Sequence, residues 1–159
     1  MSVERVPVTV RGYESWMKQL KQLKEVDRFE NVRDIERARE HGDIKENAEY
    51  HAAKEKQGMI MAYIRSFEDK ISRAQVVDPA TLSSEKVMFG ATVTLLDFNN
   101  DEEVVYQLVG EAEADLKAGR ISITSPLARG LVGREVDDAV EVTTPGGRRE
   151  YEVLAIVYQ

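Results

Sequence analysis

The sequence predicts an α+β protein: an N-terminal long antiparallel α-helical coiled-coil hairpin, followed by a small antiparallel β-sheet domain with one short helix. Three observations lead to this fold class. Residues 13–40 contain neither proline nor glycine, and apolar residues recur there at steps of three and four. The same spacing returns over residues 47–74. After residue 86 the chain instead shows short apolar runs separated by turn residues, which is typical of strands.

The first expected helix runs from Tyr13 to about Glu40. Its apolar face is predicted to comprise Trp16, Leu20, Leu23, Val26, Phe29, Val32, Ile35 and Ala38. A bundle with other helices is the alternative for such a face. Because no third long helix follows in the sequence, we expect a rod of two helices.

The second expected helix runs from Asn47 to about Ala74. Its apolar face comprises Ala53, Ile60, Ile64, Phe67, Ile71 and Ala74, with Gln57 filling the gap. The steps from Ile60 onward alternate between four and three, as in a coiled-coil seam. A helix of about 28 residues is about 40 Å long. The short connection around Gly42 makes the two helices antiparallel.

The predicted domains are a coiled-coil domain at residues 1–78, a linker at 79–85 and a second domain at 86–159. The linker contains proline and serine, which interrupt the helical pattern. Strands are expected at residues 87–96, 103–110, 120–124, 136–143 and 149–158, and a short helix at 125–132. Pro145-Gly146-Gly147 predicts the turn of a hairpin between the last two strands.

Composition limits the function. The chain has 159 residues, no cysteine and two histidines, which excludes disulfides and thiolate metal sites and disfavours zinc. The first twenty residues have no apolar segment typical of a signal peptide, and no apolar run approaches the roughly 18 residues of a membrane helix. We therefore expect a cytoplasmic protein without a membrane partner.

Charge is distributed unevenly along the chain. Residues 1–78 carry 15 Lys and Arg against 15 Asp and Glu, whereas residues 79–159 carry 7 against 14 and hold the whole net charge of −7. Autonomous binding to duplex DNA needs a basic stripe, which neither half provides. The acidic half could instead dock on a basic protein surface.

Two carboxylates, Asp43 and Glu46, lie between the two expected helices, at the end of the rod. Carboxylate oxygens on an exposed tip are suitable ligands for Mg²⁺. The same spacing also imitates a capping box, in which Asp43 accepts amide hydrogen bonds and Glu46 reaches back. Asn47 is also a good N-cap, and if it caps the second helix, both acids are left free on the loop. From spacing alone, the metal-ligand and the capping-box interpretations both stay open.

Several segments resemble the GreA/GreB family of bacterial transcript cleavage factors, in order and over nearly the whole chain. They are AREHGDIKENAEYHAA at 38–53, FGATV at 89–93, ISITSPLARGL at 121–131 and TPGG at 144–147. The resemblance implies that the C-terminal domain has an FKBP-like sheet. It also implies a transcription elongation factor that binds RNA polymerase at the rim of its secondary channel. It would stimulate the polymerase's own cleavage of the nascent RNA 3′ end in backtracked complexes, and would not itself be an enzyme.

The resemblance also implies roles for single residues. Asp43 and Glu46 would help to hold the second Mg²⁺ of the polymerase active centre, so the chain alone would bind no cofactor. Arg39 and Lys54 match the family's contacts to the RNA 3′ segment, although both are also ordinary solvated helix charges. Ser125, Pro126 and Leu127 match the polymerase-docking region. The expected state is a monomer. The small basic patch resembles the GreA branch, which implies cleavage of short fragments.

Other functions are weighed against this one. A channel-binding inhibitor of polymerase without cleavage activity is the main alternative, but the intact GDIKENA segment at 42–48 favours cleavage. A prolyl isomerase needs an aromatic-lined pocket, whereas the aromatic residues of the second half are mostly placed as strand core. A coiled-coil chaperone would present apolar rather than acidic tips.

Overall fold

The computed structural model describes residues 4–42 and 46–159. They form two compact units. One contains Tyr13–Ala74 together with Glu4, and the other contains Arg5–Gly12 together with Gln75–Gln159. The predicted domain bounds of 1–78, 79–85 and 86–159 remain a prediction, because a compact unit need not be an independently folding domain.

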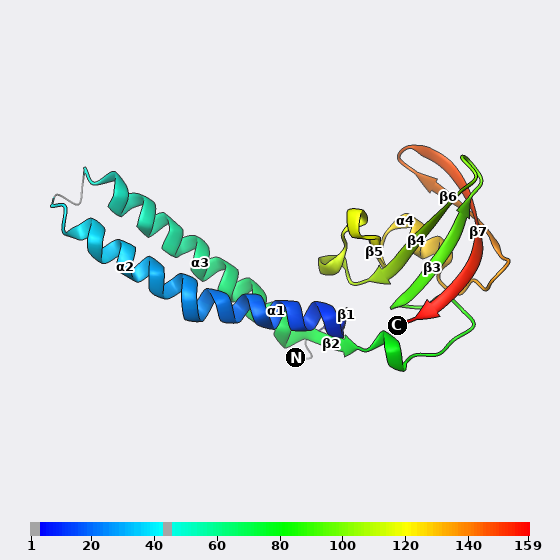
Figure 1. Ribbon diagram of the computed structural model, residues 1–159, viewed down its shortest axis with the longest axis horizontal. Coiled ribbons are helices and arrows are strands. Elements are labelled where there is room, and N and C mark those ends of the chain that lie inside the picture. The colour runs from blue at the N-terminus through cyan, green and yellow to red at the C-terminus, as the bar shows by residue number, and fades with distance from the viewer. Residues whose placement is uncertain (1–3, 43–45) are drawn as a thin grey trace. The chain divides into compact units, whose positions relative to one another are not determined.

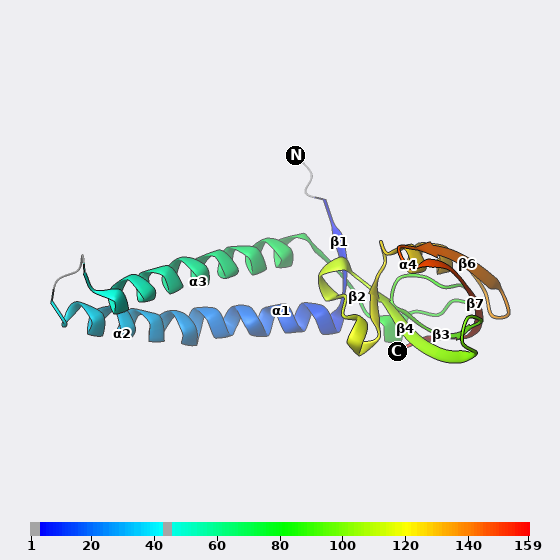
Figure 2. The same cartoon turned by 90° about the horizontal axis from the view of Figure 1, so that it is seen from above.

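The first unit is a helical hairpin. Its outgoing arm consists of α1 (Val10–Gln22), the π-helical segment η1 (Leu23–Asp27) and α2 (Arg28–Arg39), which follow one another directly. Its returning arm is α3 (Ala48–Arg73), antiparallel to the first arm in both views of the ribbon (Figures 1 and 2). The predicted rod of two antiparallel helices is therefore confirmed.

The seam of α3 is the one that the sequence predicts. Ala53, Ile60 and Ile64 are buried, and Gln57, Phe67 and Ile71 are half-buried between them. On the outgoing arm, the buried apolar residues are Trp16, Ile35 and Ala38. An ion pair of 2.7 Å between Lys24 Nζ and Glu68 Oε1 also joins the two arms at the surface. The hairpin is thus held together mainly by apolar side chains along one face of each arm.

The predicted apolar face of the outgoing arm is wrong in its middle. Val26, Phe29 and Val32 are 38%, 60% and 41% exposed. Each step of three residues advances about 300° around a helix, so consecutive steps of three fall about 60° further behind the seam each time. The wider turn of η1 keeps Asn31 and Ile35 on the seam, and Asn31 is only 1% exposed.

A two-stranded sheet of β1 (Val6–Thr9) and β2 (Ala74–Val77) was not anticipated from the sequence. In the second unit, the Thr9 backbone N–H and hydroxyl both donate hydrogen bonds to the Glu113 carboxylate. A Cβ atom added at Gly110 would lie 2.6 Å from the carbonyl oxygen of Pro7, so only glycine allows this approach. The strand β1 is therefore fixed against residues 110–113.

The main sheet has the strand order β5-β4-β3-β7-β6 (Figure 1). Its strands are β3 (Ala91–Asp97), β4 (Glu102–Val109), β5 (Arg120–Ser122), β6 (Ala139–Thr144) and β7 (Gly147–Tyr158). All neighbours are antiparallel, as predicted, except for the parallel pair β4 and β5. Residues 110–119 contain two short 3₁₀ turns, η3 (Glu111–Glu113) and η4 (Leu116–Ala118). They carry the chain back so that β5 runs parallel to the last three residues of β4, with Arg120 beside Gln107.

The core of the second unit lies between this sheet and α4 (Pro126–Leu131). Fully buried Ala128 and Leu131 of the helix pack with Val93, Leu95 and Leu108 of the sheet. A Cβ atom at Gly130 would lie 3.1 Å from Val142 Cγ2, so the helix approaches β6 closely at this point. Another short 3₁₀ turn, η2 (Pro79–Thr81), falls in the expected linker. The predicted short helix on a β-sheet is confirmed.

Candidate functional site

The candidate site lies at the turn of the hairpin, between α2 and α3. Gly42 follows the end of α2 with a φ of +105°, in the left-handed region that glycine adopts without strain. Its backbone N–H donates to the Arg39 carbonyl at 3.3 Å, which closes the end of the helix. Asp43, the first of the two predicted metal ligands, lies outside the described residues.

Asn47 is the N-cap residue of α3. It has an extended backbone, with φ −86° and ψ 96°, and its side-chain oxygen accepts a 3.0 Å hydrogen bond from the Tyr50 backbone N–H. This bond satisfies one of the amide donors that the first turn of a helix leaves free. The side-chain amide group of the same Asn47 donates to the Ala38 carbonyl in the last turn of α2. A single side chain thus forms one hydrogen bond to each of the two helix ends.

Glu46 precedes this cap, and its side chain is exposed. Within the described part of the chain, its carboxylate forms no hydrogen bond or ion pair. Asn47 occupies the position that a capping box would have assigned to the acids, so the N-cap interpretation does not account for Glu46. A free, exposed carboxylate can bind a cation whose other ligands come from elsewhere.

The charged and aromatic residues around the turn are exposed or half-buried. His41 Nε2 lies 3.3 Å from Glu49 Oε2, with side-chain exposures of 64% and 75%. On the first turn of α3, the Tyr50 ring lies 5.9 Å from the Arg39 guanidinium. The predicted RNA-contacting residue Arg39 is therefore held beside an aromatic ring, a geometry typical of cation–π contacts.

Lys54, the second predicted RNA-contacting residue, lies one turn further along α3. Its ammonium group donates to Gln57 Oε1 at 2.7 Å, and both side chains lie at the surface of the hairpin. Arg39 and Lys54 thus project from the last turn of α2 and the second turn of α3. Both cations belong to the end of the hairpin that carries Glu46.

The predicted docking residues lie in the second unit, at the start of α4. Ser125 is the N-cap, and its hydroxyl oxygen accepts a 3.2 Å hydrogen bond from the Ala128 backbone N–H. Pro126 is exposed at the first helical position, and Leu127 is half-buried against the core. The three residues therefore form a rigid, partly exposed corner.

Among the described residues, no group of three or more His, Asp or Glu side chains is arranged to hold a metal ion. Across the same residues, no helix is both long enough and apolar enough to cross a membrane. A metal held at the turn would therefore need ligands beyond Glu46, either from the neighbouring residues of the turn or from another molecule.

Asn31 is a buried polar residue below the site that the sequence analysis did not identify. It lies two turns before the end of α2, and its side-chain amide donates to the Ala53 carbonyl of α3 at 2.9 Å. An asparagine in an otherwise apolar seam is a known device for fixing helix register. Its spacing could have indicated its burial, because it lies four residues before Ile35 and seven before Ala38, on the same helix face.

Comparison with known proteins agrees with these features. Residues 6–76 match the N-terminal domain model of the GreA/GreB transcription elongation factors, and residues 82–158 match the C-terminal one. Transcription elongation factor GreA of Phenylobacterium zucineum is 54% identical over 97% of this chain and 98% of its own. The same factor of Sphingopyxis alaskensis is 57% identical over 99% and 98%.

A solved structure, of GreA factor homolog 1 from Thermus thermophilus, is 32% identical and covers 96% of this chain and 99% of its own, with a TM-score of 0.44. At so low a score, the assignment depends on the sequence matches. Two domain models that together span most of the chain, and relatives above half identity over nearly full length, leave no ambiguity. This chain belongs to the GreA/GreB family of transcription elongation factors.

Proposed function

We propose that this protein binds bacterial RNA polymerase through the secondary channel and stimulates the polymerase's own cleavage of nascent RNA in backtracked complexes. The observation that carries the proposal is the exposed carboxylate of Glu46, which has no hydrogen-bond or ion-pair partner among the residues that the structure describes. Because Asn47 caps α3, Glu46 has no structural task among the described residues and is available at the hairpin turn. Family membership supports an interaction with RNA polymerase.

Glu46, with Asp43, would supply carboxylate ligands to the second Mg²⁺ of the polymerase active centre. A second metal ion in such a site stabilises the developing charge of phosphodiester hydrolysis. The contribution of this chain is to present the carboxylates at a fixed position, so that the polymerase gains ligands without ordering flexible groups of its own. The chain therefore acts as a stimulating factor, and the catalytic centre belongs to the polymerase.

Two further groups of residues complete the proposal. Arg39 and Lys54 would contact the phosphates of the extruded RNA 3′ segment, since they are cations at the end of the hairpin that carries Glu46. Ser125, Pro126 and Leu127 would dock at the rim of the channel, and the N-cap and proline geometry keeps this corner rigid.

The test is cleavage of 5′-labelled RNA in a stalled, backtracked elongation complex at limiting Mg²⁺. We expect the wild-type protein to shorten the RNA rapidly, and Glu46→Gln or Asp43→Ala to lose most of this stimulation while binding polymerase as before. Glu49→Gln is the matched control, because it neutralises another exposed acid of the same hairpin end. Stimulation that survives in Glu46→Gln would refute the role of Glu46. Binding without any RNA shortening by the wild type would favour the channel-binding inhibitor instead.

A further inference from the structure

The two helix ends at the turn are joined by one side chain. The Asn47 clasp, defined as the Asn47 side chain with the Ala38 carbonyl and the Tyr50 N–H, uses both functions of one amide. The carbonyl of Ala38 belongs to the last turn of α2, where it also accepts a hydrogen bond from the His41 backbone N–H at 3.2 Å. The clasp thus adds one hydrogen bond to each of two different helix ends.

A second amide bridge of the same kind lies deeper in the hairpin. Asn31 of α2 donates to the Ala53 carbonyl of α3, in the opposite direction to the bond from Asn47 to α2. Ala38 lies seven residues after Asn31 on the outgoing arm, and Asn47 lies six residues before Ala53 on the returning arm. Ala38 and Ala53 are 2% and 8% exposed, and their small side chains let the two backbones approach. The last turns of α2 and the first turns of α3 are therefore joined by one side-chain hydrogen bond near the hairpin turn and by a second one deeper in the seam.

The residue directly before Asn47 is Glu46. The backbone of Asn47 is fixed because its side chain is bonded to both arms, and its carbonyl accepts the first hydrogen bond of α3, from His51 N–H at 3.1 Å. The Cα atom of Glu46 is one peptide unit away, about 3.8 Å. A shift of the clasp would therefore move the carboxylate by a similar amount.

We infer that Asn47 is the positioning residue for Glu46: it sets where the carboxylate stands relative to the two helices, and it does so through its bond to α2 as well as through its cap. The inference rests on the proposed function. The cap alone would be served equally well by aspartate or serine. Neither can replace the amide, because an aspartate carboxylate has no N–H to donate to Ala38 and the shorter serine hydroxyl already serves the cap.

Substitution at Asn47 separates the two roles. Asn47→Asp keeps a strong N-cap and removes the donor to Ala38, and Asn47→Ser does the same without adding charge beside Glu46. At saturating factor, we expect both to lower the maximal RNA cleavage rate at least about tenfold, since a misplacement of about 1 Å can cost far more. The half-saturating concentration should stay within about twofold, because the docking surface is untouched. Glu49→Gln, which breaks the exposed contact to His41 across the same helix ends, is the matched control and should change neither quantity.

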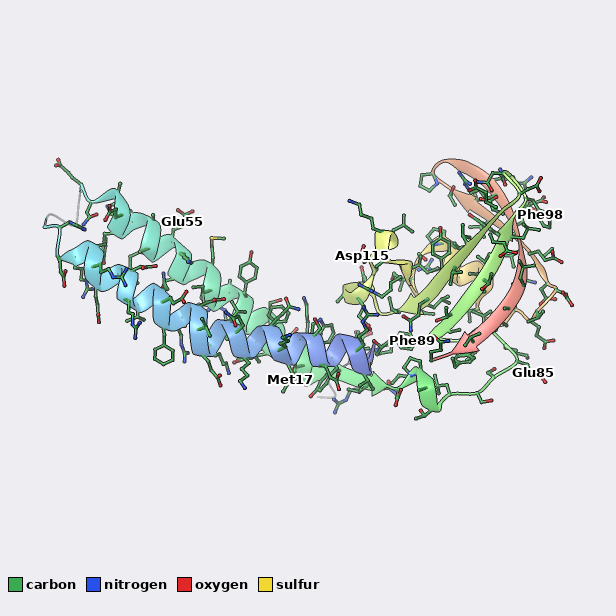
Figure 3. All side chains as sticks on the ribbon, viewed as in Figure 1. Met17, Glu55, Glu85, Phe89, Phe98 and Asp115 are labelled. Carbon is green, nitrogen blue, oxygen red and sulfur yellow. The ribbon has the colours of Figure 1, made fainter. Side chains whose placement is uncertain are left out.

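A measurement without polymerase tests the clasp directly. The chain has no cysteine, so one molecule can carry two spin labels, at Glu36→Cys on α2 and at Glu55→Cys on α3, both exposed positions (Figure 3 shows Glu55). We expect the distance distribution between the labels to broaden in Asn47→Asp and Asn47→Ser and to stay narrow in Glu49→Gln.

The outcomes are distinct. A wild-type cleavage rate in both Asn47 variants overturns the inference, as does a lost rate with an unchanged distance distribution. A higher half-saturating concentration at an unchanged maximal rate also overturns it, because Asn47 would then serve binding. A wild-type protein that stimulates no cleavage refutes the proposed function instead, and the distance distributions then decide the clasp alone.

Discussion

At the scale of single residues, asparagine has a special place in this hairpin because its amide carries both a donor and an acceptor. Asn31 uses the donor in a buried seam, and Asn47 uses both groups at a helix end. The cap acceptor of Asn47 could be anticipated from the sequence, since asparagine before an apolar run is a typical N-cap. The bonds to the facing helix could not, because they depend on which backbone carbonyl the packing brings within reach.

Asn31→Asp should destabilise the protein strongly. The change keeps the side-chain shape but replaces an N–H donor with an oxygen that faces the Ala53 carbonyl, at a position that is 1% exposed. A buried, unsatisfied polar group costs about 1–3 kcal/mol, and a charged group costs more. Urea unfolding of the variant measures the loss. Glu36→Gln, exposed on the same helix, is the control and should stay within about 0.5 kcal/mol of the wild type.

Tyr151 should make the protein sensitive to alkali. Burial raises the pKa of Tyr151, the negative Asp97 raises this pKa further, and Arg149 opposes the rise. The unfolded chain therefore loses this proton near the ordinary tyrosine value of about 10, while the folded chain still holds it. The contribution to stability is complete below pH about 10 and is lost as the pH rises through the raised pKa of the folded state.

Unfolding free energies measured from pH about 9 to 11 test this expectation. Tyr151→Phe should show a shallower decline with pH than the wild type, because phenylalanine has no proton to lose. Tyr63→Phe, at a 53% exposed position, is the comparison and should follow the wild-type curve. Parallel curves for the wild type and Tyr151→Phe would exclude Tyr151 as the source.

At the scale of elements, the two arms of the hairpin differ in how far sequence predicts them. The seam of α3 alternates steps of four and three from Ile60 onward, and these residues are buried or half-buried in the structure. The outgoing arm has steps of three from Leu20 to Ala38, which no straight helix can keep on one face. The π-helical segment η1 changes the rotation of the helix, so that Val26, Phe29 and Val32 are exposed while Asn31 and Ile35 face the seam. No local sequence motif predicted this segment.

The β1–β2 pair escaped prediction for a different reason. Its two strands have four residues each and are separated by the whole hairpin, so neither periodicity nor a turn signal marks them. The helix α4, by contrast, has a local signature in Ser125 and Pro126 and was predicted within one residue. The sequence therefore predicted the element with a local capping signal, and did not predict the strand pair that forms between distant segments.

Ser125→Ala should lower the unfolding free energy by about 1 kcal/mol, because the Ala128 N–H loses its cap acceptor. Ser125→Asp should restore this stability, since aspartate caps equally well. If the same corner docks on polymerase through the serine hydroxyl, Ser125→Asp will recover stability without recovering affinity. Urea unfolding and polymerase binding, measured on the same three proteins, separate the two roles. Full recovery of both would show that the hydroxyl serves only the cap.

At the scale of the whole molecule, the charge difference between the halves gives a prediction about partners. The whole net charge of −7 falls in residues 79–159. If this half docks on a basic polymerase surface, the factor concentration that gives half-maximal RNA cleavage should rise several-fold as salt reaches about 0.15 M, where charges are screened within about 8 Å. The maximal rate should change less. Cleavage by polymerase alone at each salt concentration is the control, and a constant half-saturating concentration would exclude electrostatic docking.

The placement of residues 5–12 affects how the chain acquires its structure. Strand β1 is synthesised before the hairpin, but its partner β2 and the Glu113 carboxylate that holds Thr9 appear only after it. The hairpin closes through contacts near in sequence, whereas β1 must wait for partners more than sixty residues away. On the ribosome, the N-terminal strand therefore remains unpaired while the helices form, and its recruitment is among the last steps of folding. An interruption of synthesis before β2 would therefore leave β1 without its partner strand.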